Sequence, residues 1–318
     1  MTRTRDLIQE IAEIRQRRMF DSAMLELPTR LFAIETAFKN HDRSENELIR
    51  YFPVALIACV EGYFRMVIKE LIDAGEPYLS NAEKAASSLK LDFSILRAVH
   101  GKAITVGELI AHGAQLSRLE HIEAVLSNLL GIKFLQAIRT ISDRWAHEIK
   151  GEPERPILTE PDGVFANVAK TFELRHIICH EIASAYEIKP EVIEKCFESC
   201  LTFLKATDAF ISETLHPGAP LTQTDMNIAA GKSLDEKRQH LAEAITMLRS
   251  RLDASELTAF NESQVKWQRY CEAWANFVAG ERAGGGTIWP LIYAGAAEAT
   301  VERRIDEISN HSWLSDGG

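Results

Sequence analysis

Apolar residues recur at intervals of three and four along nearly the whole chain, which is the period of an α-helix. Alternating apolar and polar positions between hairpin turns, the pattern of β-strands, do not occur. The sequence therefore predicts an all-α protein. Residues 2–40 are expected to be helical with a break near Pro28. A second long helix is expected from Pro53 to Ala74, where Gly75 ends it.

Further helix boundaries are marked by capping residues and prolines. Residues 105–108 (Thr-Val-Gly-Glu) and 117–120 (Ser-Arg-Leu-Glu) fit the capping box, in which two side chains accept hydrogen bonds from the first backbone N–H groups of a helix. Residues 149–163 hold three prolines, two glycines and many charges, so they are expected to form a surface loop. Two helices are expected after that loop, over residues 161–186 and 190–215.

The segment 216–220 (His-Pro-Gly-Ala-Pro) has the composition of a linker. We therefore expect a helical domain over residues 1–215 and a second, smaller one over 221–318. The second domain is expected to contain three helices, which suffice for a small bundle. Their expected ranges are 225–252, 254–281 and 290–309, with three consecutive glycines at 284–286 before the last helix.

Length and composition fit a globular protein of about two domains, at roughly 100–200 residues each. Apolar residues make up 46% of the 318 residues and charged residues 26%, which excludes disordered and fibrous classes. The net charge of −10 argues against a broad basic surface for nucleic acid. Any RNA would be held locally rather than by counterion release over a wide area.

The same composition predicts a cytoplasmic protein that does not enter a membrane. The longest uninterrupted apolar run, Val54–Val60, is far shorter than the ~20 residues of a spanning helix. The first residues lack the apolar stretch of a secretory signal. Five scattered cysteines without a Cys-x-x-Cys pair indicate free thiols in a reducing compartment.

The stretch 172–181 (Phe-Glu-Leu-Arg-His-Ile-Ile-Cys-His-Glu) combines residues suited to phosphodiester chemistry. We expect Arg175, His176 and His180 to pack among apolar neighbours, where an unpaired charge is unfavourable. Cleavage of RNA without a metal needs a base for the 2′-hydroxyl, an acid for the leaving 5′-oxygen and a cation for the phosphorane. Histidine titrates near neutral pH, and arginine presents a permanently charged planar fork to phosphate oxygens.

Arg175 and His180, with His176 directly after the arginine, resemble the Arg-x4-His motif of the HEPN superfamily, whose members are mostly helical RNases and RNase-like toxins. The helix over 55–71, with one glutamate in an apolar run, resembles the early HEPN helix. Residues 104–110 (Ile-Thr-Val-Gly-Glu-Leu-Ile) resemble a segment of a prokaryotic branch related to the RiboL-PSP-HEPN group. The resemblance covers about residues 1–215 and implies a HEPN-type helical bundle.

This resemblance implies a metal-independent endoribonuclease with no cofactor, of the toxin or antiviral-defence type. His180 would be the acid/base and Arg175 the phosphate clamp, and RNA would be cleaved to 2′,3′-cyclic phosphate and 5′-hydroxyl ends. Positions i and i+5 lie about 140° apart around a helix, so one helix aims both groups at one atom poorly. HEPN nucleases are typically dimers, and we expect an isologous homodimer with the 161–186 helix near the interface.

Two auxiliary residues have alternative interpretations. Glu61 either orients Arg175 or His180 across the helix packing, or lies on an exposed stripe with Arg65 as its partner. His176 is either catalytic or a supporting histidine.

Two pairs of residues spaced one helical turn apart are candidates for metal binding. A zinc site on His176 and His180 would need a glutamate after the first histidine, but Glu181 follows the second. Cys196 and Cys200 have no further ligands nearby in the sequence. We therefore expect no metal.

A second resemblance, to the LprI-type domain, covers about residues 221–308. It rests on four ordered blocks: 221–227, 262–267, 284–290 and 300–303. The family includes bacterial lysozyme inhibitors, whose members outside the cytoplasm usually carry cysteines where this chain has Ala229, Ala275 and Ala296 or Ala297. The missing disulfides fit a reducing compartment and make lysozyme inhibition doubtful.

The two resemblances together imply a ribonuclease effector with a C-terminal module that senses or regulates, acting on RNA and with an unknown protein trigger or antitoxin. The alternative is a non-catalytic interaction or scaffold protein, built from a helical dimer and a partner-binding C-terminal bundle.

Overall fold

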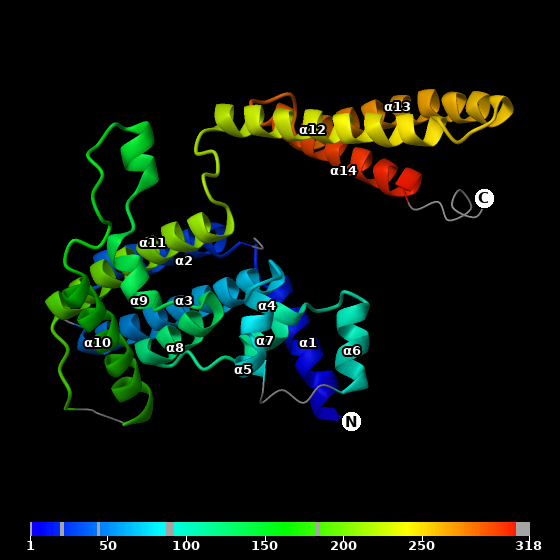
Figure 1. Ribbon diagram of the computed structural model, residues 1–318. Coiled ribbons are helices and arrows are strands. Elements are labelled where there is room, and N and C mark those ends of the chain that lie inside the picture. The colour runs from blue at the N-terminus through cyan, green and yellow to red at the C-terminus, as the bar shows by residue number, and fades with distance from the viewer. Residues whose placement is uncertain (1, 20–21, 43–44, 87–91, 182–184, 310–318) are drawn as a thin grey trace. The chain divides into compact units, whose positions relative to one another are not determined.

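The computed structural model describes residues 2–19, 22–42, 45–86, 92–181 and 185–309. Within these ranges there is no β-strand, only one isolated bridge between Ser142 and Pro156. The all-α prediction is confirmed. In chain order (Figure 1) the helices are α1 (Thr2–Gln16), α2 (Ala23–Asn40), α3 (Asn46–Asp73), α4 (Tyr78–Asn81), α5 (Glu83–Ala86), α6 (Phe93–His100), α7 (Val106–Gly113), α8 (Leu119–Leu130), α9 (Phe134–Ala137), a 3₁₀ turn (Ile138–Thr140), a π turn (Trp145–Ile149), α10 (Pro161–His180), α11 (Pro190–Leu215), α12 (Gln223–Arg249), α13 (Ala254–Ala283) and α14 (Trp289–Ser309).

The chain divides into two compact units, Met1–Pro217 and Gly218–Gly318. Gly218 has a positive φ of 64°, a conformation that favours glycine at the boundary. Each unit has its own hydrophobic core.

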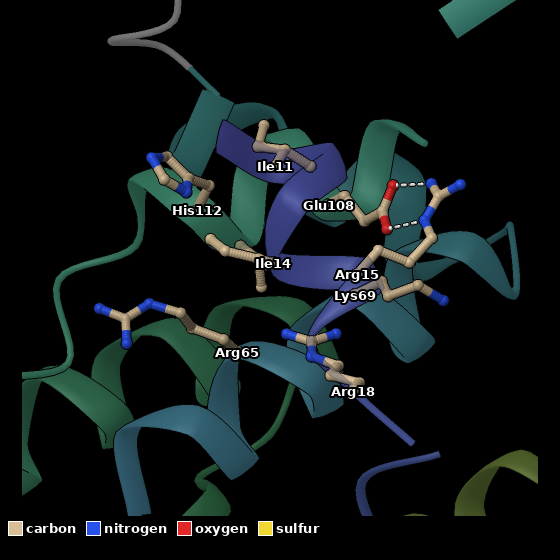
Figure 2. A pocket seen from close by; sticks show the side chains of 9 residues that line it. Ile11, Ile14, Arg15, Arg18, Arg65, Lys69, Glu108 and His112 are labelled. Carbon is tan, nitrogen blue, oxygen red and sulfur yellow. Dashed lines mark hydrogen bonds and ion pairs between the residues drawn. The ribbon is translucent and has the colours of Figure 1, made fainter. Parts of the chain in front are cut away.

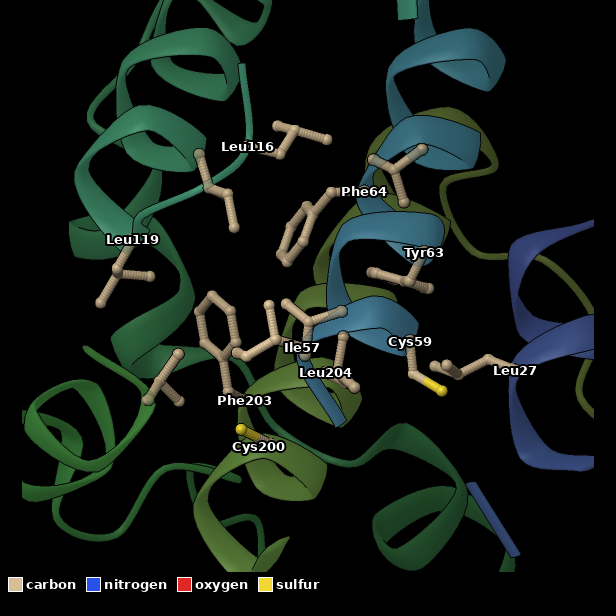
Figure 3. Close-up of a cluster of buried hydrophobic side chains, with 14 of the residues drawn as sticks. Leu27, Ile57, Cys59, Tyr63, Phe64, Leu116, Leu119, Cys200, Phe203 and Leu204 are labelled. Atoms are coloured by element: carbon tan, nitrogen blue, oxygen red, sulfur yellow. The ribbon is translucent and has the colours of Figure 1, made fainter. Parts of the chain in front are cut away.

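Helix α3 is the central element of the first unit, and α2, α7, α8, α10 and α11 all pack on it. Phe64 of α3 meets Phe203 of α11 with ring centroids 5.6 Å apart (Figure 3). Phe134 lies 6.2 Å from Phe64 in an edge arrangement. All three rings are fully buried. Burial of each such side chain contributes about 1.5–3 kcal/mol, so these aromatic contacts fix α9 and α11 against α3.

Helix α3 is also the one described helix that is long and apolar enough to span a membrane by length and composition. More than half of its most apolar window is buried inside the unit. Since the core helix of a folded domain gives the same signal, this pattern is explained by packing.

The proline-based boundaries near the N-terminus are wrong. Pro28 lies inside α2 and Pro53 inside α3. The break that was expected near Pro28 lies instead between the end of α1 at Gln16 and the start of α2 at Ala23. A proline inside a helix costs about 3 kcal/mol, but the apolar residues flanking each proline, Leu27 and Leu31 in α2 and Ile49 and Leu56 in α3, are all buried. Their burial outweighs the missing hydrogen bond.

Other boundaries agree more closely with expectation. Helix α11 has the expected bounds, but α10 ends at His180 rather than near residue 186. The side chains of Cys179 and His180 are exposed, so no burial supports further turns, and residues 182–184 lie outside the described residues. The predicted capping box at Ser117 is wrong, because α8 starts without a side-chain cap and Ser117 interacts with the His121 ring.

The second unit consists of α12, α13 and α14, and α14 packs against both of the others. Small residues fill the contact, because Ala275 of α13 and Ala297 of α14 are almost fully buried beside Leu241 of α12. Helix α13 begins with a capping box at Asp253 and ends at Gly284, which is left-handed with a φ of 53°. The three predicted helices are therefore present.

The capping box at Thr105 is confirmed, and it joins α7 to the end of α3. Thr105 Oγ1 accepts from the Glu108 backbone N–H at 3.0 Å and donates to Asp73 at 2.8 Å. The Gly107 N–H also donates to Asp73, at 3.0 Å. A Cβ on Gly107 would lie 2.6 Å from both an Asp73 carboxylate oxygen and the Lys69 carbonyl oxygen. Residue 107 must therefore be glycine for α7 to approach α3 this closely.

Gly107→Ala is expected to lower the free energy of unfolding by about 1–3 kcal/mol, the usual cost of overpacking. Urea unfolding of the full chain measures the change. Gly62→Ala is the matched control, because a Cβ at that position of α3 meets nothing within 4 Å. The control should be neutral or more stable by up to ~1 kcal/mol, owing to the higher helix propensity of alanine. Equal effects of the two substitutions would contradict the close approach.

A second cluster of polar side chains lies where α11 meets α3. Tyr63 is buried beside Asp208 and Glu70, and the Glu70 carboxylate accepts the Ala23 N–H at 3.0 Å. Burial, followed by the charge of Glu70, raises the pKa of Asp208 to about 6. Burial and the same two carboxylates raise the pKa of Tyr63 well above its usual range. The charged form of Asp208 is therefore disfavoured in the folded protein.

This raised pKa predicts that Asp208 destabilises the protein at neutral pH. An unfolded aspartate titrates near about 3.9, so the contribution of Asp208 to stability is greatest below that pH and is lost as the pH rises through about 6. Asp208→Asn should raise the free energy of unfolding at pH 7 by about 1–2 kcal/mol, allowing for partial solvent exposure. Urea unfolding from pH 4 to pH 7 should show the gain shrinking toward pH 4; a gain that is absent, or constant over this range, would refute the effect.

Candidate functional site

Arg175 of α10 and Glu61 of α3 meet across the packing of the two helices. Arg175 Nη2 donates to Glu61 Oε1 at 3.3 Å. The arginine side chain is 27% exposed and the glutamate 14%. Helix α10 is held here because Phe172 and Leu174, which flank the Arg175 turn, are buried in the core. The arginine is therefore oriented by a carboxylate while part of its guanidinium stays open to solvent.

Glu61 also faces a second arginine, one turn further along α3. Arg65 Nη1 lies 3.9 Å from Glu61 Oε2. Both interpretations of Glu61 thus describe part of its surroundings, since the carboxylate contacts Arg175 across the helix packing and Arg65 on its own helix. One negative charge between two guanidinium groups leaves an excess of positive charge at this edge of α3.

His176 and His180 lie on the surface of the last turn of α10. Their ring centroids are 5.0 Å apart, and both residues are exposed. The expectation that they pack among apolar neighbours is wrong. The fully buried residues of α10 end at Leu174, and in the last turn Ile178 packs on the core while the two histidines face away from it. The imidazoles are accessible to a ligand, but no described partner fixes them apart from each other's rings.

No group of three or more histidine, cysteine, aspartate or glutamate side chains among the described residues is arranged to hold a metal ion. Cys196 and Cys200 face the core from α11, and burial raises the pKa of the Cys200 thiol to about 12. A thiol with so high a pKa is protonated at neutral pH, whereas metal binding needs the thiolate. These two cysteines therefore serve packing.

A pocket formed by α1, α3 and α7 was not predicted from the sequence (Figure 2). It holds about 350 Å³ including its open mouth. Four permanently charged cations and one carboxylate line it, together with a histidine and three apolar residues. The lining residues are Ile11, Ile14, Arg15, Arg18, Arg65, Lys69, Glu108, Ala111 and His112.

The carboxylate in this pocket is already paired. Arg15 donates two parallel hydrogen bonds to Glu108. One runs from Nε to Oε1 at 2.8 Å, and the other runs from Nη2 to Oε2. Burial alone would raise the pKa of Glu108, but the bonds from Arg15 and from the Thr105 N–H hold it below its usual value. Glu108 is therefore ionised at neutral pH and neutralises Arg15. The other cations are partly paired as well, since Lys69 lies 3.3 Å from Asp73 and Arg65 lies 3.9 Å from Glu61.

The sequence holds a signal for this pocket. Arg65 and Lys69 follow Glu61 at intervals of four in a largely apolar stretch of α3, while Arg15 lies in the last turn of α1 and Arg18 lies two residues past its end. Charged residues at helical spacing are usually solvated, so the pattern alone indicates no site. The convergence of α1 on α3 becomes visible only in the fold.

The second unit presents an aromatic face rather than a catalytic arrangement. Tyr270, Trp274 and Phe277 lie on one side of α13 and are exposed, with the last two ring centroids 5.7 Å apart. All five cysteines of the chain are free. Cys271 is buried against α14, where its sulfur lies 3.9 Å from the Ala297 carbonyl oxygen. This unit is therefore held together without disulfides, by packing and by polar contacts between its helices such as the ion pair of Lys237 and Glu302 at 2.6 Å.

Comparison with known proteins gives one match. Residues 217–308 match the family model described as Lysozyme inhibitor LprI. No curated protein and no solved structure matches the chain. The matched residues correspond to the three-helix unit α12–α14. The chain therefore carries an LprI-like helical domain in its C-terminal part.

Proposed function

We propose that the first unit is a HEPN-type endoribonuclease that cleaves RNA without a metal, with His180 as the acid/base and Arg175 as the phosphate clamp. The observation that carries this proposal is the contact between Arg175 and Glu61, which orients a partly exposed guanidinium beside a helix end bearing two accessible imidazoles. Metal-independent cleavage of RNA requires these two groups, an oriented cation and an accessible imidazole.

In the proposed reaction an imidazole removes the proton from the 2′-hydroxyl, whose oxygen attacks the adjacent phosphorus. The bond from phosphorus to the 5′-oxygen breaks, and that oxygen takes a proton from an imidazolium. Arg175 stabilises the charge that builds on the phosphorane oxygens. The products are a 2′,3′-cyclic phosphate and a 5′-hydroxyl. His176, one turn from His180, is the candidate for the second proton transfer.

We further propose that the active species is an isologous homodimer. Arg175 turns toward α3 and Glu61, whereas His180 is exposed at the end of α10. Because residues five apart on a helix lie about 140° apart, one copy brings these groups together poorly. A two-fold axis near the end of α10 would place the imidazole of one copy beside the guanidinium of the other.

The proposed role of the LprI-like domain is to sense or regulate, through contact with a protein trigger or antitoxin in the cytoplasm. The exposed face of Tyr270, Trp274 and Phe277 supports this role, since aromatic residues are enriched at protein interfaces. Among the described residues of this unit, no arrangement of titratable groups favours a reaction of its own.

The full-length protein should cleave total RNA in the presence of EDTA, and His180→Ala and Arg175→Ala should each reduce the rate by about 100-fold or more. Products with 2′,3′-cyclic phosphate ends are expected. His240→Ala and Arg269→Ala, at exposed positions of the second unit, are matched controls and should retain full activity. If all variants cleave equally, or none does, the ribonuclease proposal fails and a non-catalytic scaffold takes its place.

Deletion of residues 219–318 should abolish the response to a trigger and leave cleavage by the first unit. The first unit has its own core, so it should fold without the second. Growth of cells that express the full chain or the shortened chain, with and without phage challenge, measures the response. Unchanged toxicity together with unchanged triggering would contradict a regulatory role.

A further inference from the structure

The pocket between α1, α3 and α7 has the chemistry of a phosphate-binding site. Arg65 and Lys69 of α3 line it, together with Arg18 from the segment that follows α1 (Figure 2). Arginine forks match the oxygens of phosphate, and lysine binds them as a point charge. These cations stand out in a chain whose net charge is −10. This gathering of cations favours an anion, which would compete with Asp73 for Lys69 and with Glu61 for Arg65.

The wall of the pocket is partly apolar. Ile11 and Ile14 of α1 and Ala111 of α7 line it beside the cations. Figure 2 shows Ile14 lying among Arg18, Arg65 and His112. An inorganic ion would use only the charged side of such a pocket, whereas the sugar or base attached to a phosphate ester has an apolar surface to contact. This combination favours a nucleotide over a bare anion.

Helix α3 connects this pocket to the Arg175 site. Arg65 lines the pocket and also faces Glu61, the carboxylate that holds Arg175. From Glu61 to Lys69 the helix rises about 12 Å. A single small anion does not contact both ends of such a stretch, but a strand with several phosphates does. The arrangement therefore favours a polymer over a free nucleotide.

We propose that this pocket is a subsite for a phosphodiester of single-stranded RNA, next to the phosphate held by Arg175 in the same strand. The inference rests on the proposed function, because the Arg175 site sets the direction in which the RNA strand runs along α3. Binding of RNA in the pocket itself requires no cleavage. The strand follows the edge of α3, with one phosphate against Arg65 and Lys69 and the adjoining sugar or base against the isoleucines of α1. The pocket thus sets which strand segment presents its scissile bond to α10.

The test is binding of a fluorescent single-stranded oligonucleotide with 2′-O-methyl groups throughout, which the proposed reaction does not cleave. Full-length protein is compared with Arg65→Gln/Lys69→Gln and with Arg18→Gln, which changes only the segment after α1. Lys232→Gln/Lys266→Gln, at exposed positions of the second unit, is the control with an equal change of charge. Thermal unfolding of each variant verifies that it is folded, and adenosine 5′-monophosphate is titrated in parallel.

The double variant should bind the oligonucleotide at least tenfold more weakly, and Arg18→Gln several-fold more weakly. Loss of this one phosphate should also reduce the slope of log affinity against log salt by about 0.7, the value per phosphate on a single strand. The control should leave affinity and slope unchanged. Affinity that is unchanged in the folded pocket variants, or lowered equally by the control, overturns the inference.

The outcomes separate this inference from the proposed function. Binding that depends on the pocket, in a protein that never cleaves unmodified RNA, supports the subsite and refutes the nuclease. Cleavage that needs Arg175 and His180 but is indifferent to Arg65 and Lys69 supports the nuclease and refutes the subsite. Pocket-dependent binding of adenosine 5′-monophosphate without binding of the oligonucleotide would instead identify a site for a free nucleotide and overturn the RNA assignment.

Discussion

The arrangement of the first unit depends on three carboxylates that α3 presents around its buried face. Glu61 accepts from Arg175 of α10, Glu70 from the first N–H of α2, and Asp73 from the first turn of α7. Each bond joins α3 to a different helix at a half-buried position, where water competes less than at the open surface. The apolar face of α3 supplies most of the stability, and these bonds set the register of the helices packed on it.

The contact between α3 and α7 explains why residues 104–110 have their sequence. Gly107 allows the close approach, Thr105 and Glu108 cap the helix, and Glu108 then binds Arg15 of α1. A structural role thus accounts for the sequence of this segment. The same bonds have a consequence for binding, because by fixing α1 beside α3 they form the wall of the cationic pocket. Glu108 therefore both caps α7 and fixes Arg15 in the wall of the pocket.

Local signals in the sequence were sufficient for much of the fold, and long-range packing decided the rest. The bounds of α11 and the Thr105 capping box could be predicted because their causes lie within a few residues. The positions of Pro28 and Pro53 misled, because their helices continue through burial against distant partners. In the candidate site, the pairing of Glu61 with Arg175 spans 114 positions and could be proposed only as one of two alternatives. The pocket needs α1 and α3 together, and nothing local predicts that contact.

Positive and negative side chains alternate along the edge of α3, and their charges do not sum to zero. Glu61 lies between Arg175 and Arg65, and Lys69 is paired with Asp73 at 3.3 Å. Two carboxylates thus face three cations along about three turns of helix. A phosphate at either end competes with Glu61 for a guanidinium that the glutamate does not fully neutralise. The same carboxylate that holds Arg175 in place therefore leaves it able to bind an anion, which a fully buried and fully matched ion pair would prevent. Partial neutralisation is the physical property that would suit this edge to transient contact with a polyanion, in a chain whose net charge is −10.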